Sequence, residues 1–265
     1  MTQLPSAVSV RESGTGTPLV LLHAFPLNAS MWSSQLDTLP GLTGDGARVL
    51  APDQRGFGGT ELGVDEPSLD LVADDLALLL DAAGIERAVV GGISMGGYVA
   101  LAFARRHPGR LSGLLLANTR ATADTDAVRA NRERIAAAVT ARGSVRLLLD
   151  EQVAAGQLGP DSQHLVARVE AMVAAASPEA VAWAHRAMAA RPESLDVLAA
   201  LRVPVAVVTG AQDPLVAPEE AELMVRARPD AELTVIPRAG HLSALETPEA
   251  FDDAVRALLA RVAAG

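Results

Sequence analysis

A serine flanked by glycines is the feature of this chain most suited to covalent chemistry. Ser94 is the centre of residues 92–96, Gly-Ile-Ser-Met-Gly, which follow an apolar run at 88–90 and precede a helix-like run at 98–104. A serine in such a strand–turn–helix adopts a strained backbone conformation and exposes its hydroxyl above the sheet. In so tight a turn, side chains at Gly92 and Gly96 would collide with neighbouring backbone. The segment therefore predicts a nucleophilic serine.

A serine hydroxyl is a weak nucleophile and needs a base within hydrogen-bond reach, which is itself oriented, usually by a carboxylate. His241 follows the last predicted strand, on the same sheet edge as Ser94, and is the predicted base. Asp213 follows the preceding predicted strand and is the predicted carboxylate, although Asp before Pro is also common in turns. The remaining histidines are interpreted as loop, helix-end, exposed or packing residues: His23, His107, His164 and His185.

Apolar runs of strand length recur along the chain, with helical segments between them. Continuous runs of this kind are typical of strands buried on both faces of a parallel sheet. The runs span residues 19–22, 48–51, 88–90, 114–116, 205–208 and 233–236. Residues 7–10 alternate in polarity before Gly14-Thr15-Gly16, which predicts an edge strand leading into a hairpin. We expect an α/β fold with a mostly parallel, doubly wound sheet flanked by helices.

Two helices of this sheet are clear in the sequence. Ser68 is a predicted N-cap for a helix that runs to about residue 83 and ends at Gly84. We expect one face of that helix to be apolar and the other acidic. The apolar set is Val72, Leu76, Leu79 and Leu80, and the acidic set is Asp74, Asp75 and Asp81. A final helix is predicted over residues 248–260.

Residues 122–201 contain no strand-like run and are predicted to form a cap. Their helical segments are 126–142, 144–155, 161–176, 178–190 and 195–201. Ligands of open α/β sheets bind at the carboxyl edge of the strands, and helices inserted between two strands would cover that edge. We therefore predict an α/β core formed by residues 1–121 and 202–265, with a helical cap, or lid, at 122–201.

Composition narrows the partners. The chain has 265 residues and a net charge of −10, and because phosphate binding needs clustered cations we expect no nucleic-acid partner. It has no long apolar run and no signal-like N-terminus, so we expect a cytoplasmic protein that does not bind a membrane. Cysteine is absent and all 22 basic residues are arginine, which excludes thiol and lysine chemistry. The histidines lack metal-ligand spacing and there is no phosphate-binding glycine loop, so no metal or cofactor is expected.

Four motifs in order resemble those of the alpha/beta hydrolase fold family over essentially the whole chain. Residues 23–28, His-Ala-Phe-Pro-Leu-Asn, are similar to its His-Gly-Phe-Pro loop, and residues 53–60, Asp-Gln-Arg-Gly-Phe-Gly-Gly-Thr, to its Asp-x-Arg-Gly-x-Gly-x-Ser loop. The serine motif is the third. Gly240-His241 followed by Glu-Thr-Pro-Glu at 246–249 is similar to the family's ending. The order Ser94, Asp213, His241 is also the family's.

The resemblance implies an oxyanion hole made by two backbone amides, those of Phe25 and Met95. Ala24 stands where the family has glycine. The resemblance also implies structural roles for three polar residues: His23 supports the Phe25 loop, and Asp53 with Arg55, read as a charged pair, holds loops at the sheet edge.

The serine nucleophile narrows the family's chemistry. Haloalkane dehalogenases and epoxide hydrolases of this fold use aspartate, and its hydroxynitrile lyases use a lysine. The Ser-Met-Gly-Gly sequence resembles carboxylesterases that also act as perhydrolases, 3-oxoadipate enol-lactonases, and carbon–carbon bond hydrolases of aromatic degradation. We favour a carboxylesterase acting on a small ester. A non-enzymatic small-molecule receptor on the same fold stays as an alternative.

The residues of the predicted cap should distinguish an esterase from an enol-lactonase. Trp183, Met172 and Met188 are predicted to line an apolar acyl pocket, or else to form the core of the cap. An enol-lactonase binds a carboxylate and needs a cation there, for which the candidates are Arg120, Arg132 and Arg134. The expected partner is thus a small-molecule ester or lactone; the sequence does not predict an oligomeric state.

Overall fold

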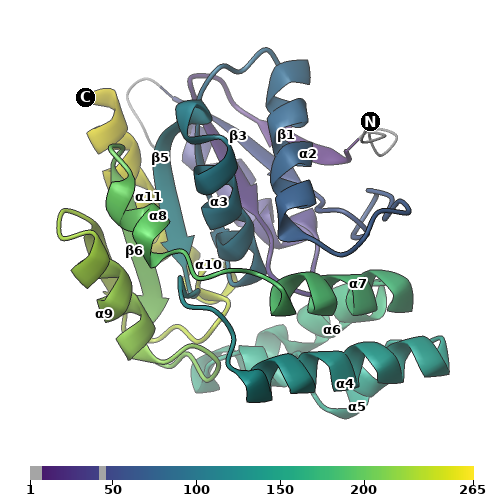
Figure 1. The fold of residues 1–265 in the computed structure, drawn as a ribbon. Helices are drawn as coiled ribbons and strands as arrows, with labels where there is room; N and C mark the ends of the chain where they lie inside the picture. Colours follow the sequence, from purple (N-terminus) through teal and green to yellow (C-terminus); the bar gives the residue numbers. More distant parts are fainter. Residues whose placement is uncertain (1–7, 42–45) are drawn as a thin grey trace.

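The computed structural model describes residues 8–41 and 46–265, and its centre is one seven-stranded sheet (Figure 1). The strand order is β1-β3-β2-β4-β5-β6-β7, and all neighbours are parallel except the antiparallel pair β1 and β3. The strands are β1 (Val10–Ser13), β2 (Thr17–Leu22), β3 (Ala47–Pro52), β4 (Ala88–Ile93), β5 (Leu111–Ala117), β6 (Val205–Gly210) and β7 (Glu232–Ile236). The predicted α/β fold is confirmed.

The predicted N-terminal hairpin is wrong. Residue 7 lies outside the described residues, and β1 begins at Val10 rather than ending there. β1 pairs with β3, in the register Val10 opposite Pro52, and not with β2. β2 is hydrogen-bonded to β3 on one side and β4 on the other, so it has no free edge to offer β1.

Helices cover both faces of the sheet because successive strand side chains point to opposite sides. In β2, Leu19 and Leu21 belong to one apolar cluster, whereas Val20 and Leu22 belong to the other. Helices α2, α3, α8 and α9 pack together over one face, and α1 and α11 over the other. These helices are α1 (Ser33–Thr38), α2 (Leu69–Ala82), α3 (Met95–Arg106), α8 (Leu195–Ala200), α9 (Pro218–Ala227) and α11 (Pro248–Ala263), with the short α10 (Ser243–Glu246) before the last.

Helix α2 begins and ends where its sequence predicts. The Ser68 side chain accepts a hydrogen bond from the Asp70 amide, and Gly84 follows the helix with φ of +66°. One predicted surface residue is misplaced: Asp75 is buried, because Arg55 from the loop after β3 forms a two-pronged ion pair with it. A charge on the inner side of a helix is tolerated when a fully matched partner is present.

The helices between β5 and β6, called the cap below, lie at the carboxyl end of the strands, where the arrowheads of β5 and β6 point in Figure 1. They include α4 (Asp126–Arg142), α5 (Arg146–Asp150), α6 (Val166–Ala174) and α7 (Pro178–Ala189), and α4 packs along α7. Two predicted helices are shorter: residues 151–157 form turns and a 3-10 segment, and 160–165 are 3-10 before α6 begins. Helix α8, at the end of the predicted cap segment, packs on α3 and α9 of the core.

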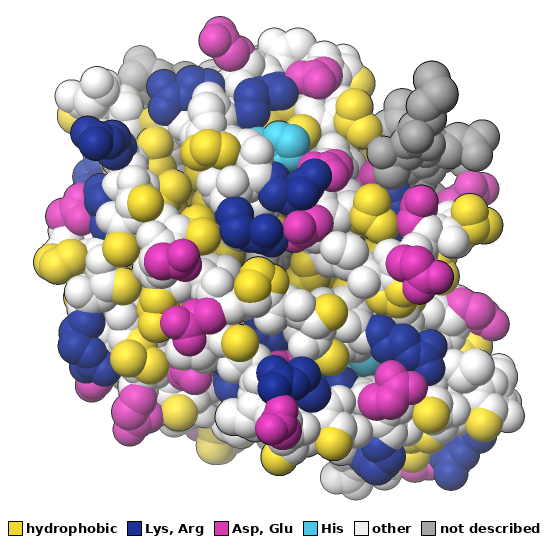
Figure 2. Space-filling view, viewed as in Figure 1, with side chains coloured by type: hydrophobic (Ala, Val, Ile, Leu, Met, Phe, Trp, Pro, Cys, Tyr) yellow, Lys and Arg dark blue, Asp and Glu magenta, His cyan; other side chains and the backbone are white. Residues whose placement is uncertain are grey.

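The surface mixes charges. Over the face drawn in Figure 2, acidic and basic side chains are interspersed, with no continuous basic field on that face. Among residues 8–41 and 46–265, no helix combines the length and apolar character that crossing a bilayer requires.

Candidate active site

Ser94 occupies a sharp turn between β4 and α3. Its backbone has φ 56° and ψ −114°, an unusual conformation for a residue with a side chain. Two contacts hold the turn: the Ser94 amide donates to the Ala117 carbonyl at 3.1 Å, and the Thr119 hydroxyl donates to the Ser94 carbonyl at 2.8 Å. A Cβ at Gly92 or Gly96 would lie 2.4 or 2.1 Å from the Leu22 carbonyl oxygen. The turn therefore has the geometry that the sequence predicts.

His241 and Asp213 meet at the same sheet edge, in the loops after β7 and β6. The ring nitrogen Nδ1 of His241 lies 2.9 and 3.0 Å from the two carboxylate oxygens of Asp213. Both side chains are almost completely buried. Burial by itself would raise the pKa of Asp213, but hydrogen bonds from His241, Asn118 and the Leu215 amide outweigh it and lower that pKa. Asp213 is thus held as a carboxylate against the imidazole.

Ser94 and His241 line one cavity but are not hydrogen-bonded to each other in this structure. Catalytic hydrogen bonds are often long or poorly aligned without substrate and tighten in the complex. Because Asp213 holds Nδ1 of the His241 ring, Nε2 is the nitrogen left to take a proton.

Asn118, which no motif of the sequence indicates, joins these loops. Its side-chain amide donates to Asp213 Oδ2 and to the Gly240 carbonyl, both at 3.0 Å, and its oxygen accepts from the Ser243 hydroxyl at 2.6 Å. Its φ is +44°, which asparagine tolerates better than most residues. The signal in the sequence was a polar residue directly after a buried strand, at the edge that carries the other site residues.

Glu246 fixes the loop on the other side of the histidine. Its carboxylate accepts from the amides of Gly240 and Leu242, which flank His241, at 3.0 and 2.9 Å. It also accepts from the amide of Gly159 in the cap at 2.8 Å. One carboxylate therefore connects the cap to the His241 loop.

The two amides expected in an oxyanion hole are free. Within the described residues, neither the Phe25 nor the Met95 amide donates to another protein group. The Met95 amide is the first of α3, where the helix dipole favours negative charge. Ala24 is not among the described non-glycine residues with positive φ, so alanine fits there without strain.

His23 holds the loop that contains Phe25 in place through hydrogen bonds of both its ring nitrogens. It is fully buried, its Nε2 accepts from the Gln54 amide at 2.9 Å, and its Nδ1 lies 3.0 Å from the Ala24 carbonyl oxygen. Since Nε2 accepts, the ring proton is on Nδ1 and donates to that carbonyl. Burial lowers the pKa of His23 to about 4. With both nitrogens occupied, His23 joins the loops after β2 and β3.

Asp53 and Arg55 hold neighbouring loops but do not pair with each other, contrary to the expected charged pair. Asp53 accepts from the amides of Ala29 and Gly59 at 2.8 and 2.9 Å. Arg55 instead binds Asp75 and, at 2.9 Å, Asp65.

A cavity of about 310 Å³ opens between the cap and the sheet edge. Besides Ser94 and His241, the wall of the cavity is formed by one set of apolar and one set of polar side chains. The apolar side chains are Phe25, Tyr98, Val128, Val153, Met188, Leu215 and Val216, and the polar ones are Arg120, Asp124, Asn131, Arg132, Gln157 and His185.

The predicted pocket residues divide into two sets. Met188, Arg120 and Arg132 line the cavity, whereas Trp183, Met172 and Arg134 are not part of its wall. Trp183 donates from its indole nitrogen to the Asp65 carbonyl at 2.9 Å, and Met172 is packed in an apolar cluster. Arg134 is exposed and pairs with Glu151. The face of α7 that meets the cavity carries His185 and Met188, three residues apart.

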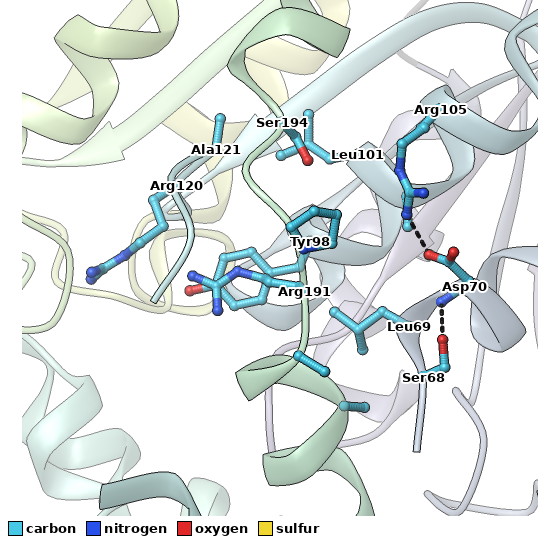
Figure 3. A pocket seen from close by; sticks show the side chains of 14 residues that line it. Ser68, Leu69, Asp70, Tyr98, Leu101, Arg105, Arg120, Ala121, Arg191 and Ser194 are labelled. Carbon is cyan, nitrogen blue, oxygen red and sulfur yellow. Dashed lines mark hydrogen bonds and ion pairs between the residues drawn. The ribbon is translucent and has the colours of Figure 1, made fainter. Parts of the chain in front are cut away.

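A second, smaller cavity of about 120 Å³ lies behind Tyr98, which lines both spaces (Figure 3). In Figure 3 the Arg191 guanidinium lies over the Tyr98 ring, 3.9 Å from its centre. The charges around this cavity are already matched: Arg105 pairs with Asp70, and Arg191 with Asp124.

Within the described residues, no three His, Asp or Glu side chains are grouped so that they could hold a metal ion.

Comparisons with known proteins agree on one family. The chain is 38% identical to a thermophilic esterase from Thermogutta terrifontis, whose structure was solved with malate bound. The match covers 97% of each chain, with a TM-score of 0.88. It is 29% identical over 251 residues to 3-oxoadipate enol-lactonase 2 of Acinetobacter baylyi, covering 92% of this chain and 88% of that one. It is 30% identical over 251 residues to a putative carbamate hydrolase of Caulobacter, covering 89% and 88%.

A family model described as alpha/beta hydrolase fold matches residues 17–248, which include Ser94, Asp213 and His241. With this match, and with the sheet and its order of strands, the chain belongs to the alpha/beta hydrolase fold family.

Proposed function

We propose that this hydrolase cleaves a small carboxylic ester through a covalent acyl-enzyme on Ser94. The observation that carries the proposal is that His241, hydrogen-bonded to the buried Asp213, lines the same cavity as a serine held in a strained turn. A base oriented by a carboxylate beside an exposed hydroxyl is the arrangement that activates a serine for acyl transfer.

The steps follow from these positions. His241 Nε2 takes the Ser94 hydroxyl proton as the oxygen attacks the ester carbonyl, and Asp213 stabilises the imidazolium that forms. The oxyanion is bound by the free amides of Phe25 and Met95, each of which contributes roughly 3–4 kcal/mol to transition-state stabilisation. His241 then protonates the leaving alcohol. In the second half a water, deprotonated by His241, releases the acid and restores Ser94; peroxide in place of water would give a perhydrolase side reaction.

The size of the cavity supports a small substrate. Its volume of about 310 Å³ is near the lower end of the range of ligand pockets. The related esterase bound malate, a small oxygen-rich acid.

The lactonase alternative is supported by two arginines in the cavity wall and by the relative of that name. However, Arg132 is engaged by Asp124 at 2.5 Å, and Arg120 donates to the Leu215 carbonyl at 2.8 Å. The charge of each arginine thus already has a protein partner, since Glu220 also lies 3.8 Å from Arg120, while Nε of Arg120 makes no hydrogen bond. This ranks a neutral ester above a carboxylate-bearing lactone.

Multiple-turnover hydrolysis of p-nitrophenyl acetate and butyrate tests the proposal. We expect Ser94→Ala to abolish turnover and His241→Ala to reduce it by roughly 10³-fold or more while both variants stay folded. His164→Ala, a substitution of an exposed cap histidine, serves as the matched control and should leave the rate unchanged.

Three results would count against this function. Activity retained in His241→Ala would contradict its role as base. A single slow turnover with tightly held product would favour a receptor. Faster hydrolysis of 3-oxoadipate enol-lactone than of any simple ester would favour the lactonase.

A further inference from the structure

Several buried polar atoms in the cavity wall lack hydrogen-bond partners. Among the described residues they are Gln157 Oε1, both ring nitrogens of His185, Arg120 Nε and Asp124 Oδ1. Of these, Asp124 Oδ1 is ion-paired with Arg191 at 2.7 Å. A buried polar atom without a partner costs about 1–3 kcal/mol, and native proteins hold few of them. Their concentration around one cavity beside Ser94 indicates groups kept free for a ligand.

Gln157 lies on the base side of the cavity. The residue is 3% exposed, and its backbone carbonyl accepts the hydrogen bond of the His241 amide at 3.0 Å. The side-chain amide of Gln157 is therefore anchored close to the catalytic loop, while no protein group uses its oxygen.

His185 lies on the oxyanion side. It is 5% exposed, and its ring meets the Phe25 ring edge-on, with the ring centres 4.6 Å apart. Burial, and then the positive charges of Arg132 and Arg134, lower the pKa of His185 to about 3, with Asp124 acting in the opposite direction. The imidazole is therefore neutral near pH 7 and offers one donor and one acceptor.

The donors and acceptors of Gln157 and His185 determine which chemical group of a ligand would satisfy them. The Gln157 amide and the neutral His185 ring together present acceptors as well as donors. A ketone or a carboxylate only accepts and would leave the acceptors Gln157 Oε1 and one His185 nitrogen unpaired. An alkyl chain would satisfy none of these atoms. A hydroxyl group both donates and accepts, so it matches the mixture of donors and acceptors that the two residues present to the cavity.

We propose that Gln157 and His185 form a subsite for a hydroxyl group on the acyl chain of the substrate. The substrate class is accordingly an ester of a small hydroxy acid. This subsite rests on the proposed function, because the acyl chain reaches it from an ester bound at Ser94.

The test compares two p-nitrophenyl esters of similar shape, β-hydroxybutyrate and isovalerate, in which a methyl group replaces the hydroxyl. We expect kcat/KM to favour the hydroxy ester by about tenfold or more, because the isovalerate leaves the polar atoms unpaired. In His185→Phe and in Gln157→Leu this ratio should fall toward one. His164→Phe, in which the replaced histidine is exposed, is the matched control and should keep the wild-type ratio.

Binding of the two free acids, measured by calorimetry on the wild-type protein and on the same variants, provides a readout that does not need turnover. Hydroxyl-dependent binding that disappears in His185→Phe supports the subsite even if no ester is cleaved, in which case the proposed function alone fails. Equal kcat/KM and equal affinity for the two compounds in the wild type would overturn the subsite. So would a preference that survives both substitutions.

Discussion

The backbone amide of His241 donates a hydrogen bond to the carbonyl of Gln157, 3.0 Å away in the cap. The candidate base is thus attached to the cap helices as well as to the loop that follows the sheet. Gly240 and Gly159 make the same junction: a Cβ at Gly240 would lie 2.2 Å from the Gly159 nitrogen. The carboxylate of Glu246 completes it by accepting from both glycine amides.

This junction predicts that Glu246 positions the base without touching substrate. Glu246→Gln replaces one of the two acceptor oxygens with an NH₂ group, which would face an amide donor. We expect kcat to fall by about tenfold with KM little changed, and the free energy of unfolding to fall by about 1–3 kcal/mol. The control is Glu249→Gln, which neutralises an exposed carboxylate three residues away. An unchanged kcat in Glu246→Gln, with stability lost, would reduce Glu246 to a purely structural role.

Asn118 should matter because it donates to Asp213 and to the Gly240 carbonyl together. Asn118→Asp keeps a side chain that tolerates its positive φ but removes both donors and adds a like charge beside Asp213. Repulsion between the carboxylates raises the pKa of Asp213, so on acidification Asp213 takes up a proton at a higher pH than in the wild type and stops orienting His241. The kcat/KM of the variant should therefore fall further below that of the wild type toward the acidic end of the pH range. A pH–rate profile measures this difference. A profile that coincides with the wild type would show that Asn118 does not control the charge of Asp213.

The tight turn at Ser94 predicts a strong contrast between two glycines. Gly96→Ala places a Cβ 2.1 Å from the Leu22 carbonyl oxygen, so backbone must move, and we expect a loss of roughly 3 kcal/mol or more in the free energy of unfolding. Gly109 has no atom within 4 Å of such a Cβ, and Gly109→Ala should change stability by less than about 1 kcal/mol. Denaturant unfolding of both variants measures the difference; equal losses would contradict the packing argument.

The sequence predicts the central strands β2, β3, β4, β5 and β6 well because they are buried almost throughout and read as continuous apolar runs. The apolar run at 233–236 is also a strand, β7, but its expected burial on both faces is wrong, because β7 is an edge strand with Leu233 and Val235 exposed. The sequence also predicts the order of Ser94, Asp213 and His241 at one sheet edge, since each residue follows a strand of the same direction. The sequence does not predict the partner of β1. β2, the next strand in the chain, is paired on both sides, so β1 pairs with the free edge of β3. Asp75 is misread for a similar reason: its partner Arg55 is distant in sequence.

The cavity wall is the part that periodicity does not resolve. Trp183 and Met188 are both apolar residues of α7, yet only Met188 lines the cavity. Which side of α7 faces the cavity depends on how the helix packs on α4 and the core, which the sequence pattern does not show. For the same reason His185 is not distinguished from a packing histidine. Its role becomes visible only when its missing hydrogen bonds are seen beside the cavity.

The two buried histidines predict sensitivity to mild acid. Burial, the largest cause in each case, lowers the pKa of His23 to about 4 and that of His185 to about 3, against about 6.5 in an unfolded chain. As the pH falls below about 6.5, the unfolded chain takes up protons that the folded protein does not. Stability is therefore complete above that pH, and each histidine removes about 1.4 kcal/mol per pH unit until its folded pKa is reached.

His185→Phe separates the two contributions. The variant should lose roughly half of the histidine-dependent slope of unfolding free energy between about pH 6 and pH 4. At neutral pH it should be at least as stable as the wild type, because the substitution removes two buried nitrogens that have no partner. Denaturant unfolding at a series of pH values measures both effects. A large loss of stability at pH 7 would instead mean that His185 is held by interactions of the fold itself, whereas a stable variant is expected when a residue is retained for its ligand at a cost to the folded protein.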